Sequence, residues 1–122
     1  MQFDDIRDQI LAILSSVRGR FLTSYQICQM LEESNPALWR DLVRAYPSAH
    51  PATPMGEGTG HRYSPASFVS NALKHFLANG SVPGLRQESL DSRGSSFNGI
   101  EPGFTGPELG IWAIGASPSA PD

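Results

Sequence analysis

The stretch that most constrains this sequence is 64–80, SPASFVSNALKHFLANG. Ser64 is typical of a helix N-cap, because its hydroxyl accepts a hydrogen bond from a backbone N–H that the first turn leaves unpaired. Pro65 then stands at the first helical position, where a missing N–H costs nothing. Asn79 and Gly80 predict the end of the helix, since glycine readily adopts the left-handed conformation that closes helices.

The predicted helix has two different faces. Apolar residues recur at the spacing that places side chains on one stripe of a helix, and polar residues recur at the same spacing on another. The apolar set is Val69, Ala72, Leu73, Phe76 and Leu77, and the polar set is Ser67, Ser70, Asn71 and Lys74. The polar face of such a helix is either exposed to solvent without a binding role or in contact with a partner.

Three shorter helices are predicted before it. The first spans 4–17, with carboxylates in its first turns, where the helix dipole is positive. An apolar pair at 21–22 is a candidate short strand, and Thr23 with Gln26 then forms a T-x-x-Q capping box that opens the second helix. A third helix is predicted over 36–45. The inward-facing residues of these helices are Phe3, Ile6, Ile10, Leu11, Ile13, Leu14, Val17, Ile27, Met30, Leu31, Trp39, Leu42 and Val43, with Cys28 beside them.

The remaining segments lack helical periodicity. Three prolines and three glycines predict a long loop over 47–63, and loops of this length are often functional or disordered. Beyond the central helix, strands are predicted over 85–90 and 109–114, with a polar hairpin turn over 91–98. The tail 116–122 is polar and contains proline, which predicts disorder. The fold class is therefore α+β, in one domain over residues 1–115.

Composition narrows the function classes. The chain has 122 residues, a net charge of −3 and a single cysteine, Cys28, which excludes an internal disulfide. Neither a signal peptide nor an apolar run long enough to span a bilayer is visible, so we expect a soluble cytoplasmic protein. The three histidines and Cys28 do not have the spacing of a zinc site. No grouping of catalytic residue types appears, so we expect no enzyme, metal or cofactor.

The order of the predicted elements resembles that of a winged helix-turn-helix domain. Residues 64–73, SPASFVSNAL, are similar to the T/S-P-x-x-T-V-S-x-x-L run of the restriction-associated branch called HARE-HTH. Residues 110–114, GIWAI, resemble its G-x-Y/W-A-L strand, and 23–31 resemble the opening of its second helix. The resemblance implies three to four helices followed by a small antiparallel β-hairpin wing, with the helix at 64–80 as the recognition helix.

A winged helix would direct the polar face of its recognition helix into the major groove of DNA. Asn71 is of a type that pairs with adenine, while serine and lysine side chains reach phosphates and base edges. The expected DNA-binding residues are Arg62, Ser64, Ser67, Ser70, Asn71, Lys74, Arg86 and Arg93. An ordinary solvated face explains the helix residues equally well, and the wing contains only two arginines, set among Glu88 and Asp91.

Two functions from different classes remain open. The first is a DNA-binding module, such as a transcriptional regulator or a phage- or restriction-related factor, whose partner is double-stranded DNA. Because a small acidic domain binds DNA weakly alone, we expect a homodimer or attachment to a partner. The second is a protein–protein interaction module on the same fold, for which the net negative charge is no obstacle. A membrane partner is not expected.

Overall fold

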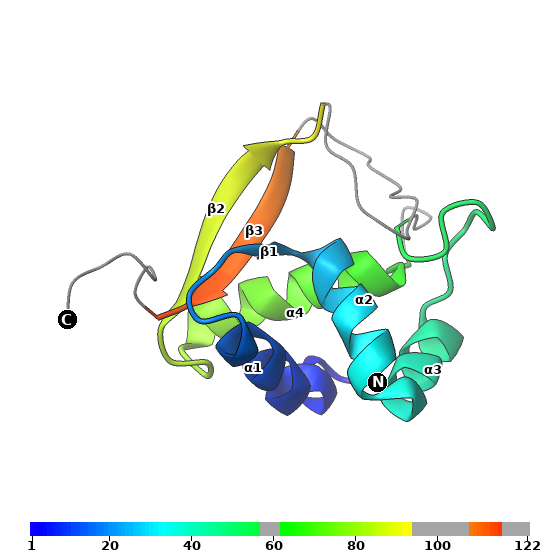
Figure 1. The fold of residues 1–122 in the computed structure, drawn as a ribbon. Coiled ribbons are helices and arrows are strands. Elements are labelled where there is room, and N and C mark those ends of the chain that lie inside the picture. The colour runs from blue at the N-terminus through cyan, green and yellow to red at the C-terminus, as the bar shows by residue number, and fades with distance from the viewer. Residues whose placement is uncertain (57–61, 94–107, 116–122) are drawn as a thin grey trace.

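The computed structural model describes residues 1–56, 62–93 and 108–115, and these form an α+β fold. Four α-helices and a three-stranded antiparallel sheet make up the described part (Figure 1). In chain order the elements are a 3-10 turn at Phe3–Ile6, α1 (Arg7–Ser16), β1 (Leu22–Thr23), α2 (Ser24–Ser34), α3 (Pro36–Ala45), α4 (Pro65–Asn79), β2 (Leu85–Asp91) and β3 (Glu108–Ile114).

The predicted helix boundaries are confirmed where capping residues mark them. The Ser64 hydroxyl accepts a hydrogen bond from the Ser67 N–H at the start of α4, and Gly80 closes that helix in the left-handed conformation. Thr23 and Gln26 form the capping box of α2, with the Gln26 N–H donating to the Thr23 hydroxyl. These local hydrogen bonds satisfy donors that a helix start leaves unpaired.

The first helix differs slightly from its predicted form. Its first turn, Phe3–Ile6, is a 3-10 turn, and the α-helix begins only at Arg7. The Asp5 side chain accepts a hydrogen bond from the Gln2 N–H at 2.8 Å, which completes a capping box at this turn. Tight turns of this kind are common at helix N-termini, and the hydrophobic spacing does not distinguish them.

The sheet contains the two predicted longer strands and β1, which overlaps the candidate short strand at 21–22. β3 lies in the centre with antiparallel partners on both sides, in the order β1-β3-β2. Leu22 pairs with Trp112 on one side of β3, and Gln87 pairs with the same residue on the other. In Figure 1 the β2–β3 hairpin rises away from the helices, while α4 runs near its base.

The predicted polar hairpin over 91–98 is wrong in part. Asp91 is the last residue of β2 and pairs with Glu108, so the two strands are not joined by a tight turn at Arg93. The rest of that predicted hairpin, 94–98, lies outside the described residues, as does the tail 116–122. Several positions in this region have residue types that favour turns, so the sequence does not show where the strand pairing ends. That limit is set by the pairing register, which depends on contacts between distant strands.

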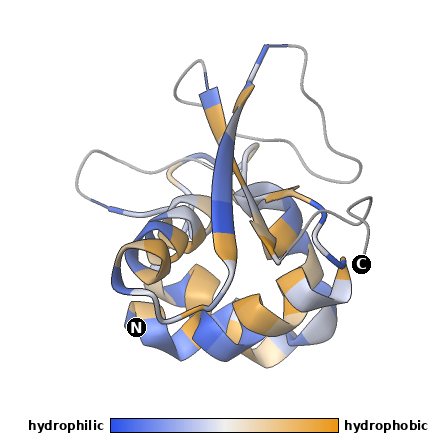
Figure 2. Cartoon of the chain, turned by 90° about the vertical axis from the view of Figure 1, so that its left-hand side faces the viewer, coloured by the Kyte–Doolittle hydropathy of each residue, from blue (hydrophilic) through white to orange (hydrophobic). Residues whose placement is uncertain are grey.

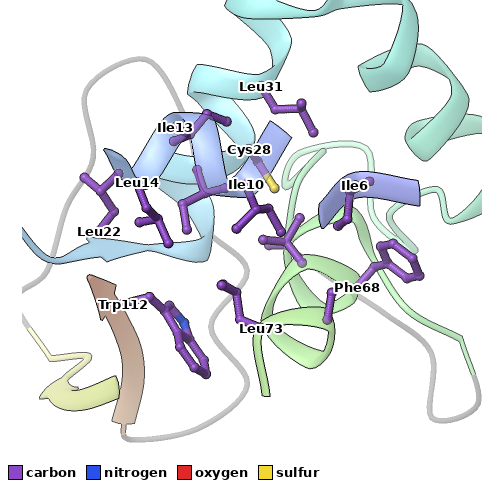
Figure 3. Close-up of a cluster of buried hydrophobic side chains, with 14 of the residues drawn as sticks. Ile6, Ile10, Ile13, Leu14, Leu22, Cys28, Leu31, Phe68, Leu73 and Trp112 are labelled. Atoms are coloured by element: carbon purple, nitrogen blue, oxygen red, sulfur yellow. The ribbon is translucent and has the colours of Figure 1, made fainter. Parts of the chain in front are cut away.

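The core lies where α1, α2 and α4 meet the sheet, and α3 extends it by packing against α2. Ile10 and Leu14 from α1, Leu73 from α4 and Trp112 from β3 point into one cluster (Figure 3). The helices in Figure 2 alternate between hydrophobic and hydrophilic segments, as expected when one side of each packs inward. This cluster places the base of the hairpin firmly against the helices.

The burial of three hydrophobic residues became clear only from the tertiary structure. Leu77, predicted on the apolar stripe of α4, is 40% exposed although the adjacent Phe76 is fully buried, so it lies on the side of α4 that no neighbouring element of the described part covers. Phe68 is instead fully buried and stacks on Tyr46 with ring centroids 4.6 Å apart. Met55, within the predicted loop, is also buried, and its carbonyl accepts a hydrogen bond from the Ala66 N–H.

Candidate nucleic-acid interface

A polar pocket of about 380 Å³ lies between α4, the start of α2 and the hairpin strands. It is lined by Ser24, Tyr25, Gly56, Ala66, Ser67, Ser70, Asn71, Lys74, Gln87, Ser89, Glu108, Leu109 and Gly110. The polar residues predicted on the outer stripe of α4 are all among them. The structure therefore directs this stripe towards a concave surface shared by three elements.

The four polar residues of α4 have different freedom to bind a ligand. The Ser67 hydroxyl accepts from the Ser64 N–H at 2.7 Å and is occupied by the cap. The Asn71 amide donates one hydrogen to the Ser67 carbonyl at 2.8 Å, which holds the side chain along the helix and leaves its oxygen available. Within the described residues Ser70 makes no hydrogen bond and the exposed Lys74 makes no ion pair, so both can meet a ligand.

Two residues predicted to bind DNA lie beside the start of α4. The prediction for Ser64 concerns the helix start, which favours an anion. Its side chain is fully buried and caps the helix, so the hydroxyl itself is not placed to contact a ligand. The hydroxyl of an N-cap residue points towards the N–H groups of the first helical turn, and in this fold the surrounding residues bury it. Arg62 is exposed just before the helix but does not line the pocket.

The two arginines of the hairpin lie away from the pocket. Successive residues of a strand point to opposite faces, so Arg86 lies on the face opposite to Gln87. Its guanidinium carbon lies 5.1 Å from the centroid of the Phe21 ring, which is a cation–π distance. Arg93 is exposed near the end of β2 and forms an ion pair with Asp91 at 2.7 Å. The structure does not bring either arginine together with α4.

The hairpin contributes pocket residues that were not predicted as site residues. Gln87 and Ser89 line the pocket from β2, and Gly110 and Glu108 line it from β3. In an antiparallel pair, residues directly opposite each other share a face, and Ser89 pairs with Gly110. The alternation along 85–90 already places Gln87 and Ser89 on one side of their strand, but only the tertiary fold shows that this side meets α4.

The charges around the pocket balance. Lys74 contributes one positive charge and Glu108 one negative charge, while serine, asparagine and glutamine supply the remaining polar side chains. Burial, with a smaller contribution from the nearby Cys28, raises the pKa of Tyr25 to about 12, so its phenol stays protonated at neutral pH. The pocket is therefore suited to hydrogen bonding rather than to strong electrostatic attraction.

The Asp91–Arg93 pair affects protonation at the end of the hairpin. Hydrogen bonds from the Arg93 side chain and backbone hold the pKa of the Asp91 carboxyl below its usual value. The same pairing raises the pKa of Arg93. Both groups are fully charged at neutral pH, and Asp91 neutralises much of the field that Arg93 would offer to a phosphate.

The described ranges contain neither a cluster of metal-ligating side chains nor a membrane-spanning helix. No group of three or more histidine, cysteine or acidic side chains there is arranged to hold a metal ion. None of the helices in these ranges has the length and apolar character needed to cross a membrane. Comparison with known proteins found no matching family model, curated protein or solved structure.

Proposed function

We propose that this chain is a winged-helix module of the HARE-HTH type that binds double-stranded DNA through the pocket face of α4 and the hairpin. In this proposal α4 is the recognition helix and β2–β3 is the wing. The observation that carries it is the convergence of Ser70, Asn71 and Lys74 with the inner face of the hairpin on one polar, concave surface. A purely solvated helix face would not need a second polar element opposite it.

The arrangement of the elements supports the proposal. α1, α2 and α4 pack together, and the hairpin follows α4 directly, as the sequence resemblance implies. Asn71 and Lys74 lie one helical turn apart, so their side chains project from the same side of α4. This spacing suits a helix that lies along a groove and contacts a base edge and a phosphate together.

The first experiment is a titration of a fluorescently labelled random duplex with the full chain at several salt concentrations. We expect binding at low salt that weakens as salt rises, because contacts to phosphates release counterions. Lys74→Gln should weaken binding and reduce the salt slope by about one. Glu108→Gln should strengthen binding, because it removes the carboxylate that opposes phosphate at the same pocket.

Arg40→Gln is the matched control, because Arg40 is exposed on α3 and does not line the pocket. It removes the same charge as Lys74→Gln and should leave binding nearly unchanged. Equal losses in the two variants would indicate nonspecific attraction to total charge. A wild-type protein that binds no duplex at low salt would refute the proposal.

A second candidate function is a protein–protein interaction module on the same fold, and one surface favours it. Phe3, Tyr46 and Tyr63 form a half-exposed aromatic cluster over Phe68, with Tyr63 36% exposed. Clusters of partly exposed aromatic side chains are typical of interface centres. Tyr63→Ser should leave duplex binding intact if DNA is the partner, and should abolish partner binding if the cluster is the functional surface.

A further inference from the structure

The indole N–H of Trp112 is one of the buried polar groups that have no hydrogen-bond partner among the described residues, beside the Ser81 hydroxyl and two guanidinium nitrogens of Arg86. Trp112 itself is fully buried. A buried donor without an acceptor is unfavourable, because it has lost its hydrogen bonds to water and gained none in return. Trp112 reaches from β3 towards α4 (Figure 3), and its cross-strand partner is the pocket residue Gln87.

Gly110 opens the space beside this N–H. A Cβ placed on Gly110 would lie 3.4 Å from Trp112 Nε1 and 3.3 Å from the Gln87 side-chain nitrogen. The missing side chain thus leaves a small notch in the pocket wall with two nitrogen donors beside it. The backbone at Gly110 does not have a positive φ, so its conformation does not require glycine.

We propose that this notch holds one backbone phosphate of duplex DNA, with Trp112 Nε1–H and the Gln87 amide as donors to a phosphate oxygen. The inference rests on the proposed function and adds a defined phosphate subsite on the hairpin side of the pocket. Because Gln87 is exposed, its amide turns aside easily and admits the oxygen to the buried indole N–H. The bound oxygen then satisfies a donor that the free protein leaves unpaired.

The surroundings of the notch favour an anion with several acceptor oxygens. Ser24, the first residue of α2, lines the same pocket, and the positive end of a helix dipole attracts phosphate. Lys74 adds a positive charge from α4. Glu108 is the opposing group, but it lies two residues from Gly110, roughly 7 Å along the strand. A phosphate in the notch therefore meets more donors than acceptors.

The indole N–H signals of the two tryptophans show directly whether a ligand binds at the notch. In a ¹H–¹⁵N NMR spectrum, each indole N–H gives its own signal, and Trp39, buried in α3 away from the pocket, serves as the internal control. We expect the Trp112 indole signal to move on addition of a short duplex while the Trp39 indole signal stays in place. Inorganic phosphate alone is the second arm, and a shift of Trp112 there identifies the phosphate group as sufficient.

Gly110→Ala tests the notch itself. The added methyl group fills the space between the two donors, and we expect duplex binding to weaken roughly tenfold, the loss of about one hydrogen bond to a charged group. Gln87→Glu is the second variant, at an exposed position where folding should not suffer, and its carboxylate should repel the phosphate. Ala12→Glu, exposed on α1, adds the same charge elsewhere and should have little effect.

The possible outcomes separate this inference from the proposed function. If duplex binds but the Trp112 signal stays in place and Gly110→Ala binds as the wild type does, the notch is refuted while DNA binding stands. If no duplex binds but inorganic phosphate moves the Trp112 signal, the phosphate subsite stands and DNA as its source is refuted. If neither ligand moves the signal, the inference is overturned.

Discussion

Two serines one turn apart in sequence, Ser64 and Ser67, show how position changes the role of one residue type. Both are predicted DNA-binding residues, Ser67 because hydroxyls bond phosphate oxygens and Ser64 because the helix start that it caps favours an anion. Ser64 is buried, and its hydroxyl caps α4. Ser67 closes the reciprocal bond of the same capping box, although it also lines the pocket. Their contribution is to the stability and direction of the helix that carries Asn71 and Lys74.

Ser64→Ala should therefore destabilise the protein without changing contacts to DNA directly. Removing an N-cap side chain costs about 1 kcal/mol, and here the Ser67 N–H would lose its acceptor in a buried setting. Urea unfolding followed by circular dichroism measures the change. Ser15→Ala, at an exposed position in α1, should change stability by much less. Equal stability of the two variants would contradict the capping role.

At the scale of elements, α2 links the core to the pocket. Its first residues line the pocket, while Ile27, Cys28 and Leu31 are buried in the core. Burial raises the pKa of the Cys28 thiol well above its usual value, with Glu32 contributing in the same direction, and burial raises that of Tyr25 to about 12. Both groups of α2 are therefore neutral in the folded protein over a range in which the unfolded chain ionises them.

The stability of the fold should consequently fall in alkaline solution. The unfolded chain releases the thiol proton above pH 9 and the phenol proton above pH 10, while the folded protein keeps both, so unfolding releases protons and becomes easier as the pH rises. We expect the free energy of unfolding in urea to drop between pH 8 and pH 11. Cys28→Ala should show a shallower drop, and an identical pH dependence would contradict the assignment to the thiol.

For the whole molecule, the arrangement of charge limits the strength of the DNA binding that we propose. The chain has a net charge of −3, and the pocket contains one cation and one carboxylate. The cations of the hairpin are engaged by the Phe21 ring and by Asp91 instead. A single copy thus offers few phosphate contacts, which favours a binding mode in which two copies engage one duplex.

Light scattering coupled to size exclusion tests this binding mode. We expect the pure protein to elute with about twice its chain mass of 13.2 kDa, or to reach that stoichiometry on a short duplex, because two modules on one ligand multiply their individually weak contacts. The Lys74→Gln variant should form less of the complex with DNA at the same concentrations and keep its own elution position. A complex containing one copy per duplex would contradict the dimeric mode.

The helices could be predicted from the sequence alone because their signals are local. A cap, a proline at the first position and a terminating glycine act within a few residues of chain, and they place α4 without any distant contact. The bounds predicted for α3 and the two longer strands are confirmed to within a residue, since hydrophobic spacing and proline act at the same short range. The polar stripe of α4 followed from the same spacing.

The tertiary structure alone decided which polar groups meet. Gly110 and Gln87 are separated by a long stretch of chain, and their place beside Trp112 depends on the strand register. The same register turns Arg86 to the opposite face of the sheet, and packing buries Ser64 and Met55. Local periodicity determines which side of an element a residue occupies, whereas the neighbour on that side depends on contacts between distant segments, which short-range signals do not encode.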